Sequence, residues 1–300
     1  MNDMLKVIWF ITNKIPDKKL SWEAKMFLMT HYFSSPFYKQ INFKNWFSNI
    51  NNNQYGGGKK RVHKYKGHEF TINIDTDEEN KSLVITMVSY DDEAVNCFML
   101  VKTRNTDYIV IQNLEYNREC AKKGLPKKGG EIILMFLLKY ITVNKEKLGI
   151  NRIVLSDNSF IFCDNCEGSI KLAHMYTLTK GDTWYGKFGF RPYNASSNEP
   201  NIKKIEKYEE NKEKMNKLKV RDIDLIKIMK ENENDKNKEV FERNMLLVKA
   251  LQKKHKDVEL RKILKSLSKH NCCFMVHMQE ILMEELGLTS FYQTSFYLDI

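Results

Sequence analysis

The sequence predicts an α/β (α+β mixed-sheet) protein in which a mixed, twisted sheet is flanked by helices. Four segments with alternating apolar and polar residues predict consecutive antiparallel strands, at 68–75, 83–90, 94–102 and 108–116. An almost wholly apolar segment at 130–147 predicts a buried helix, and a short apolar strand follows at 152–156. Strand, helix and strand in this order form a βαβ unit, which implies a parallel pair within the sheet.

The remaining segments complete a predicted layout of four regions. A helix beginning at Trp22 and a Gly- and Lys-rich stretch give an N-terminal helical extension and linker at 1–60. The core at 61–195 ends with a helix at 169–185, shortened near Gly181, and a strand at 188–191. Residues 196–288 predict a helical insertion, and 289–300 a final strand that returns beside 188–191. A separate C-terminal helical domain is the competing layout.

Composition limits the class of protein. The chain has 300 residues, 42% of them hydrophobic, and a formal net charge of +11, which indicates a globular protein with affinity for polyanions. The coding bias of an AT-rich genome would produce the same excess of lysine. Six cysteines are few for a disulfide scaffold, and the apolar run at 7–11 is too short for a signal peptide or a membrane span. We therefore expect a cytoplasmic, soluble and reduced protein.

Two segments carry a family resemblance. Residues 184–192 read WYGKFGFRP, which resembles the Tyr-x-Lys-x-Gly-Phe-x-Pro signature that closes the core of the GNAT N-acetyltransferase superfamily. The order of four strands, a Gly/Lys loop, a buried helix and a strand is similar to that core, over about residues 68–193 and a possible last strand at 291–300. The resemblance implies a sheet with a V-shaped opening between its fourth and fifth strands, and acetyl-CoA as co-substrate.

The loop before the buried helix is the candidate site for the cofactor's pyrophosphate. It reads KKGLPKKGG over 122–130 and leads into a helix N-terminus, whose free N–H groups and partial positive charge bind phosphate. The candidate cofactor-binding residues are Lys123, Gly124, Lys127, Lys128, Gly129 and Gly130, together with Asn158 after the strand at 152–156. The loop departs from the Gln/Arg-x-x-Gly-x-Gly/Ala spacing that is usual in the family. The alternative is a flexible basic loop without a ligand.

The resemblance also implies two catalytic residues. Tyr185 matches the family's recurrent tyrosine, which protonates the departing CoA thiolate, and a phenol remains protonated at neutral pH. Glu115, on the predicted fourth strand, is the candidate base for the amine. Tyr185 could instead be a core aromatic residue, and Glu115 an exposed side chain. Asp157 also follows the strand at 152–156, where open sheets place ligands. The alternative is that Asp157 forms a turn or a helix cap.

Metal and nucleic-acid binding receive less support. Cys163-x-x-Cys166 is one half of a zinc site, and the other half would need Cys272-Cys273, His270 or His277. Adjacent cysteines rarely bind one zinc and a second CxxC is missing, so we expect no metal. The basic run at 58–66 could contact nucleic-acid phosphate or merely solubilise a linker.

The sequence therefore predicts an acyl-CoA-dependent N-acyltransferase that acts on an amine. The alternatives are a catalytically inactive GNAT-like scaffold that acts through interactions, and a basic nucleic-acid-associated protein. The helical insertion could cover the acceptor site or bind a protein partner. No membrane association is expected.

Overall fold

The computed structural model describes residues 60–77, 82–89, 96–127, 129–166 and 168–300. The helix predicted to begin at Trp22 lies outside these residues. The protein is mixed α/β: nine described strands belong to one mixed sheet, and β7 and β8 form a separate hairpin. Each helix in the described ranges is too short or too polar to cross a bilayer.

The chain divides into two compact units. The first comprises Met1–Asn105 and Asn113–Phe136, and the second comprises Thr106–Gln112 and Leu137–Ile300. Strand β5 (Tyr108–Leu114) and helix α4 (Gly129–Leu148) therefore contribute residues to both units. This division differs from the predicted one, because the helical tract clusters with the last strands of the sheet.

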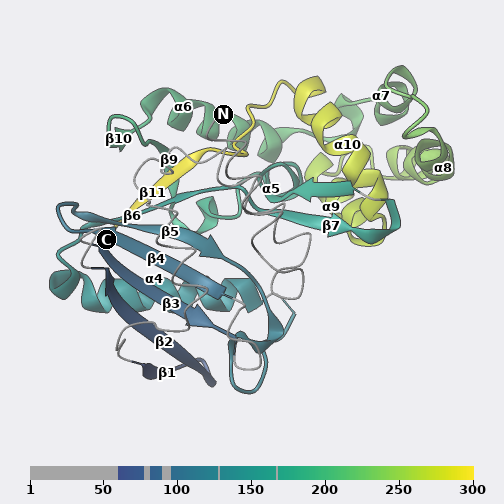
Figure 1. Ribbon diagram of the computed structural model, residues 1–300. Coiled ribbons are helices and arrows are strands. Elements are labelled where there is room, and N and C mark those ends of the chain that lie inside the picture. Colours follow the sequence, from purple (N-terminus) through teal and green to yellow (C-terminus); the bar gives the residue numbers. More distant parts are fainter. Residues whose placement is uncertain (1–59, 78–81, 90–95, 128, 167) are drawn as a thin grey trace, which may run out of the picture. The chain divides into compact units, whose positions relative to one another are not determined.

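The first unit contains an antiparallel array of four strands, drawn side by side in Figure 1. The strands are β1 (Arg61–Tyr65), β2 (His68–Asp77), β3 (Ser82–Val88) and β4 (Asn96–Thr103). Alternate apolar residues are buried, as the period-two pattern predicts, and Phe70 of β2 stacks on Phe136 of α4 with ring centroids 4.5 Å apart. Strand β1 was not predicted: the sequence indicated a linker up to residue 60, and the basic run at 58–66 was interpreted as a phosphate contact or as part of a solubilised linker.

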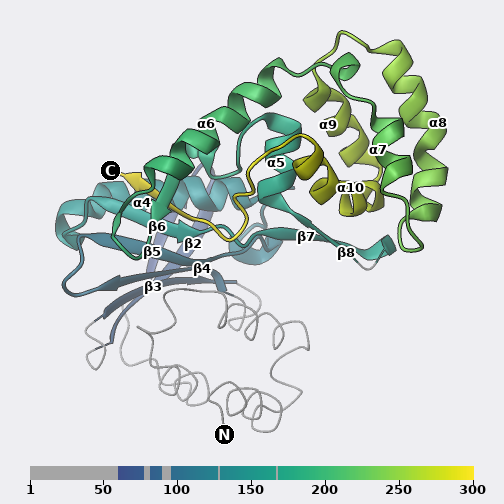
Figure 2. The ribbon, with the colours of Figure 1, turned by 90° about the horizontal axis from the view of Figure 1, so that it is seen from above.

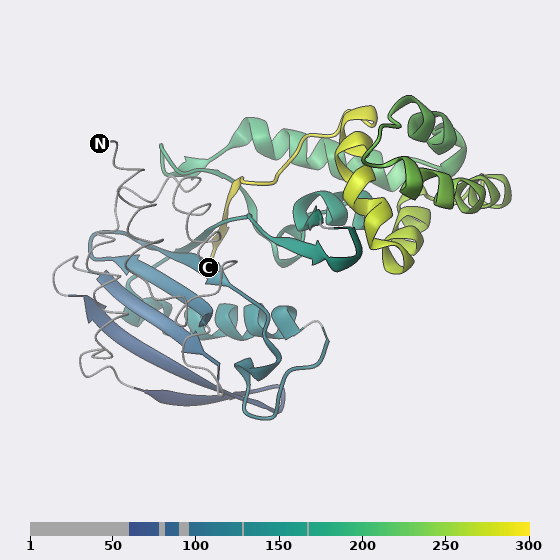
Figure 3. The same ribbon diagram turned by 45° about the vertical axis from the view of Figure 1, so that its right-hand side comes forward.

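The second unit contains the parallel pair that the βαβ pattern predicts. Strand β5 pairs in parallel with β6 (Arg152–Ser156), from Tyr108–Arg152 to Ile111–Leu155. Strand β11 (Ser295–Asp299) pairs antiparallel with both β6 and β9 (Arg191–Asn194), and β10 (Glu199–Pro200) extends the edge. Figure 3 shows the yellow end of the chain passing from α10 into β11.

The segment between β6 and β9 differs from its prediction. The hairpin of β7 (Phe160–Cys163) and β8 (Gly168–Lys171) precedes helix α5 (Leu172–Lys180), whereas a single helix was predicted over 169–185. The strand predicted at 188–191 begins only at Arg191. The reason is a turn at Gly189, whose φ of +93° ends the short 3-10 helix η4 (Gly186–Phe188).

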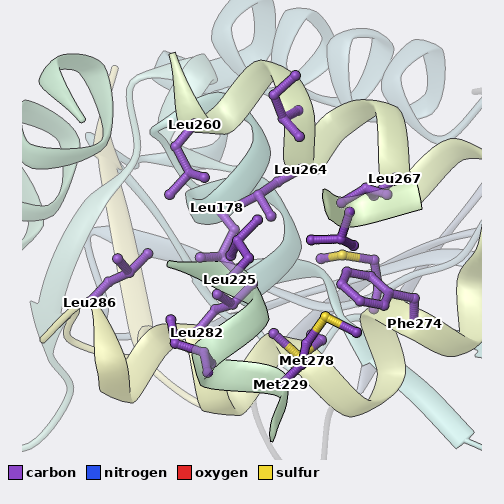
Figure 4. Packing of buried hydrophobic residues seen from close by; sticks show 14 of the residues in the cluster. Leu178, Leu225, Met229, Leu260, Leu264, Leu267, Phe274, Met278, Leu282 and Leu286 are labelled. Carbon is purple, nitrogen blue, oxygen red and sulfur yellow. The ribbon is translucent and has the colours of Figure 1, made fainter. Parts of the chain in front are cut away.

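The helical tract has an apolar core of its own. It consists of α6 (Ile202–Lys217), α7 (Leu225–Glu231), α8 (Lys238–Lys254), α9 (Leu260–His270) and α10 (Cys272–Glu285), which Figure 2 shows with α5. Leu178 of α5 packs among buried leucines and methionines of α7, α9 and α10 (Figure 4). Because α5 supplies side chains to this core, apolar packing joins the tract to the rest of the second unit.

Candidate functional site

Asp157 is a buried carboxylate directly after β6. Its side chain is fully buried, and its backbone is fixed by hydrogen bonds with Gln293 and Thr294 just before β11. Its Oδ1 accepts hydrogen bonds from the backbone N–H and the hydroxyl of Ser159. Its Oδ2 is buried and has no hydrogen-bond partner among the described residues. Burial raises the pKa of Asp157 to about 6, although the bonds from Ser159 oppose the rise.

Tyr185 lies near Asp157 in the same unit. Its side chain is 6% exposed. Burial raises the pKa of the phenol, and the negative charge of Asp157 raises it further, so the hydroxyl stays protonated at neutral pH. The rings of Trp184 and Phe190 meet the Tyr185 ring edge to face, with centroids 4.8 and 5.9 Å away. The site therefore combines a phenol that holds its proton with a carboxylate that titrates near neutrality.

The signature segment around Tyr185 is held by close packing. The backbone N–H of Gly186 donates to Thr183 Oγ1 over 3.0 Å. A β-carbon at Gly186 would collide with the hydroxyl of Tyr208 on α6, which bonds to Asp182. Helix α6 therefore fixes this turn, and a glycine is needed there for close approach.

A histidine and a second tyrosine lie in the same region. His174 of α5 is buried, and its Nε2 lies 2.6 Å from the hydroxyl oxygen of Ser290. Its Nδ1 is buried without a partner in the described part of the chain. Burial, with a smaller contribution from Lys171, lowers the pKa of His174 to about 4, so this imidazole is neutral at pH 7. The ring of Tyr292 meets the His174 ring. Burial raises the pKa of Tyr292, and the charge of Asp157 adds a smaller rise.

The Gly/Lys loop belongs to the first unit and is more ordered than a flexible loop. A disulfide joins Cys97 of β4 to Cys120 in the 3-10 helix η2 (Arg118–Cys120), although the sequence predicted reduced cysteines. The hydroxyl of Tyr116 donates to the carbonyl of Pro126 over 3.1 Å. These bonds hold the chain that leads into α4.

The loop glycines have structural roles that the sequence did not predict. The N–H of Gly129 donates to Pro126 O over 2.9 Å, so this N–H already has a partner. A β-carbon on Gly129 would lie 2.5 Å from the Tyr116 ring. Gly124 has a φ of +73°, which favours glycine. Gly130 has more space, because a β-carbon there would lie 3.6 Å from Tyr116.

The other predicted site residues are distributed over both units. Lys123 and Lys127 are exposed in the first unit, and Lys128 lies outside the described residues. Glu115 is also in the first unit, where its backbone N–H donates to Cys97 O. The residue is exposed, but partial desolvation of the carboxyl raises its pKa. Asn158 is half-buried beside Asp157 in the second unit. The structure thus brings Tyr185, Asp157 and Asn158 into one unit.

A cluster of cysteines lies elsewhere in the second unit. Cys163 ends β7, Cys166 ends the 3-10 helix η3 (Asp164–Cys166), and Cys272 and Cys273 begin α10. The sulfur atoms of Cys163, Cys166 and Cys273 all lie within 4.8 Å of one another. Cys163 is paired with Cys272 as a disulfide. The sequence named these four residues, but it could not show that they meet.

A cavity of about 280 Å³ lies at the opposite end of β6. Asp107, Gly149, Asn151 and Ile300 contribute to its lining, near the amino ends of β5 and β6. Open sheets place ligands at the carboxyl ends of their strands, where Asp157 lies. We therefore base the candidate site on the Asp157 and Tyr185 chemistry rather than on this cavity.

No family model matches the chain, and no curated protein and no solved structure matches it. The function is therefore inferred from the side chains of the candidate site. In the sequence, Asp157 was interpreted as a ligand residue or as part of a turn or a helix cap. The one local signal for Asp157 was its position directly after a buried strand.

Proposed function

We propose that the protein is an N-acyltransferase that transfers an acyl group from acyl-CoA to an amine. The observation that carries the proposal is the pairing of Tyr185 with Asp157, whose buried Oδ2 has no hydrogen-bond partner among the described residues. A strongly perturbed buried carboxylate beside a buried phenol is typical of a catalytic site. The signature at 184–192 and the β5–β6–β11–β9 strand order support the same function.

The reaction needs an acid and a base close together. The amine nitrogen attacks the thioester carbon, a C–N bond forms, and the C–S bond then breaks. In the tetrahedral intermediate the nitrogen and the sulfur are attached to the same carbon, so the groups that serve them must be neighbours. The charge of Asp157 raises the pKa of Tyr185, and this effect supports assigning the two roles to these residues.

The protons can be balanced with these two residues. Asp157 accepts the proton that the amine loses, directly or through water, and Tyr185 donates its hydroxyl proton to the departing thiolate. Passage of the proton from Asp157 to the tyrosinate restores both groups, and the products are an amide and free CoA. Asp157 takes the base role that the sequence analysis assigned to Glu115, because it lies in the same unit as Tyr185 and its pKa is near neutrality.

The cofactor's pyrophosphate would bind at the start of α4. Exposed Lys123 and Lys127 supply positive charge there, and the first turn of α4 supplies N–H groups, including that of Gly130. Since the N–H of Gly129 already has a partner, it is not part of the proposed phosphate contact. That this loop and Tyr185 bind the same cofactor stays a prediction.

The test is release of free CoA from acetyl-CoA in the presence of a panel of small amines and peptides. The Tyr185→Phe variant should lower kcat by about 10²- to 10⁴-fold, the usual contribution of acid catalysis, and leave the affinity for acetyl-CoA unchanged. Tyr193→Phe is the matched control. It removes the hydroxyl of a buried tyrosine of β9 that donates to Asn198 Oδ1, and its turnover should stay at the wild-type level.

Each outcome discriminates between functions. Equal turnover in the Tyr185→Phe and Tyr193→Phe variants would contradict the acid role. A folded protein that neither binds acetyl-CoA nor consumes it with any amine would favour the interaction scaffold. Salt-sensitive retention on nucleic acid, without acyl transfer, would favour a nucleic-acid-associated protein.

A further inference from the structure

The four clustered cysteines come from two segments far apart in the sequence. Cys163 and Cys166 flank the turn of the β7–β8 hairpin, and Cys272 and Cys273 form the first turn of α10. Cys163 and Cys272 are 109 positions apart along the chain. Convergence of four thiols from two such segments is what a metal site requires, and a local turn does not explain it.

The spacing of the sulfur atoms fits a tetrahedral metal. Zinc binds thiolate sulfur at about 2.3 Å, so two ligands of an ideal tetrahedron lie roughly 3.8 Å apart. The sulfurs of Cys163 and Cys273 are 3.7 Å apart. Those of Cys163, Cys166 and Cys273 all lie within 4.8 Å, and Cys272 reaches the same Cys163 sulfur from the other segment. The sequence analysis noted that adjacent cysteines rarely bind one zinc. Here Cys273 lies with Cys163 and Cys166, and Cys272 lies against Cys163.

The protein holds the two segments together independently of the sulfurs. Gln279 of α10 is buried, accepts a hydrogen bond from the Lys171 N–H over 2.8 Å, and donates to Ser169 O over 2.8 Å. Gly168, the first residue of β8, lies so close to Val276 of α10 that a β-carbon would collide with it. The site is therefore preorganised by polar and apolar contacts between hairpin and helix.

The start of α10 favours thiolates at two of the four positions. Cys272 and Cys273 occupy the first turn of a 14-residue helix, where the helix dipole stabilises negative charge.

We propose that Cys163, Cys166, Cys272 and Cys273 bind one structural Zn²⁺ through four thiolates. The four thiols release their protons to solvent as the metal binds. A site with four protein ligands has no open position for a substrate, so its role is structural. It ties the β7–β8 hairpin to α10 within the second unit, which also holds Asp157 and Tyr185. This site replaces the sequence-based expectation of no metal.

The Cys163–Cys272 disulfide and the zinc site are alternative states. A dithiol reductant gives two electrons and two protons to the Cys163–Cys272 disulfide. The reductant becomes a disulfide itself, and the protein is left with two thiols. Zinc then binds all four cysteines. The proposal therefore applies to the reduced protein.

The test is the metal content of the full-length chain. The protein is reduced, incubated with excess zinc and freed of unbound metal, and its zinc content is measured by mass spectrometry. We expect about one zinc per chain, as for a single four-ligand site. The Cys166→Ser and Cys273→Ser variants should lose it. A Cys97→Ser/Cys120→Ser double variant is the matched control and should retain it, because those cysteines lie in the other unit.

Cobalt provides a second measurement that needs no variant to fold. Tetrahedral Co²⁺ bound by four thiolates shows intense visible bands and a sulfur-to-metal charge-transfer band, and zinc should displace both. A folded, reduced wild-type chain that retains no zinc and gives no such spectrum would overturn the proposal. Retention of zinc by the Cys166→Ser and Cys273→Ser variants would overturn it as well. Neither result depends on acyl-CoA, so failure of this site and failure of the acyltransferase are distinguishable.

Discussion

At Asp157, the stability of the fold and the proposed chemistry favour different side chains. A buried carboxylate with one unpartnered oxygen is costly to ionise, and this cost is the reason that its pKa is raised. A protein that needed Asp157 only as a turn residue would be more stable with asparagine there. The retained charge is therefore best explained by the chemistry that we assign to it.

The first residue-scale prediction concerns the stability of the Asp157→Asn variant. The native state binds the Asp157 proton more tightly than the unfolded state does, so the stability contribution of this group falls as pH rises from about 4 to about 6. At pH 7 the ionised form costs about 3 kcal/mol, a pKa rise of roughly two units at 1.36 kcal/mol each. The variant should be more stable by up to this amount at pH 7, and by little at pH 4.

Denaturant unfolding of wild type and variant at several pH values measures this difference. The comparison must use the difference between the stability–pH curves of wild type and variant. The reason is that His174 makes stability depend on pH in the opposite direction. Its pKa is lowered to about 4, so its stability contribution is lost as pH falls from about 6.5 to 4. A variant that is less stable than wild type at pH 7 would contradict the assignment of Asp157 as an uncompensated buried charge.

The second residue-scale prediction concerns the rate. If Asp157 is the base, kcat/KM should rise with pH through an apparent pKa near 6, the value that burial gives this group. The Asp157→Asn variant should lose both this dependence and most of its turnover. An acid limb that persists unchanged in the variant would assign the base role elsewhere, with Glu115 as the next candidate.

At the scale of elements, the strongest sequence patterns were the most informative. Helix α4 lies within a residue of its predicted bounds at each end, because it is apolar around most of its circumference. The pattern of strand β6 predicted its bounds without error. The hairpin β7–β8 was missed, because two four-residue strands joined by a Cys-x-x-Cys turn have too few residues to show a period. Edge strand β1 was missed because three of its five residues are exposed and do not show a clear alternation of apolar and polar side chains.

The element-scale prediction tests how the hairpin packs on α10. The Gly168→Ala variant should lower the free energy of unfolding by about 1–3 kcal/mol, the usual cost of overpacking, because the new methyl group collides with Val276. The Gly168→Ala/Val276→Ala double variant should recover part of this loss beyond additivity. Gly130→Ala is the matched control, since a β-carbon there makes only an ordinary contact with Tyr116.

Unfolding of wild type, of the single variants Gly168→Ala and Val276→Ala, of the double variant and of the Gly130→Ala control measures the coupling. Additive effects of the two substitutions would show that Gly168 and Val276 do not touch. In that case the support for a preorganised cysteine site would also be lost.

At the scale of the whole molecule, the sequence could not predict which distant segments meet. Asp157 and Tyr185 are separated by the β7–β8 hairpin and α5, and the two cysteine pairs are separated by most of the helical tract. Local patterns specify helices and strands, whereas such meetings depend on tertiary packing. The mixed α/β class was predicted, because the βαβ pattern implies it.

The division into two units also limits what local patterns predict. The Gly/Lys loop lies in the first unit, and the Tyr185 signature lies in the second. The first has a helix N-terminus with lysines, which suits phosphate, and the second has a buried phenol whose pKa is raised by burial and by Asp157. That one acetyl-CoA binds to both segments stays a prediction.

Calorimetric titration of the reduced, full-length protein with acetyl-CoA tests that claim most directly. The account predicts saturable binding of about one acetyl-CoA per chain, and a rise in unfolding free energy of about 2.7 kcal/mol at a hundredfold excess over Kd. A Lys123→Ala/Lys127→Ala variant should bind more weakly, and Tyr185→Phe should bind as wild type does. A folded protein that shows neither a heat of binding nor a stability increase would contradict the account.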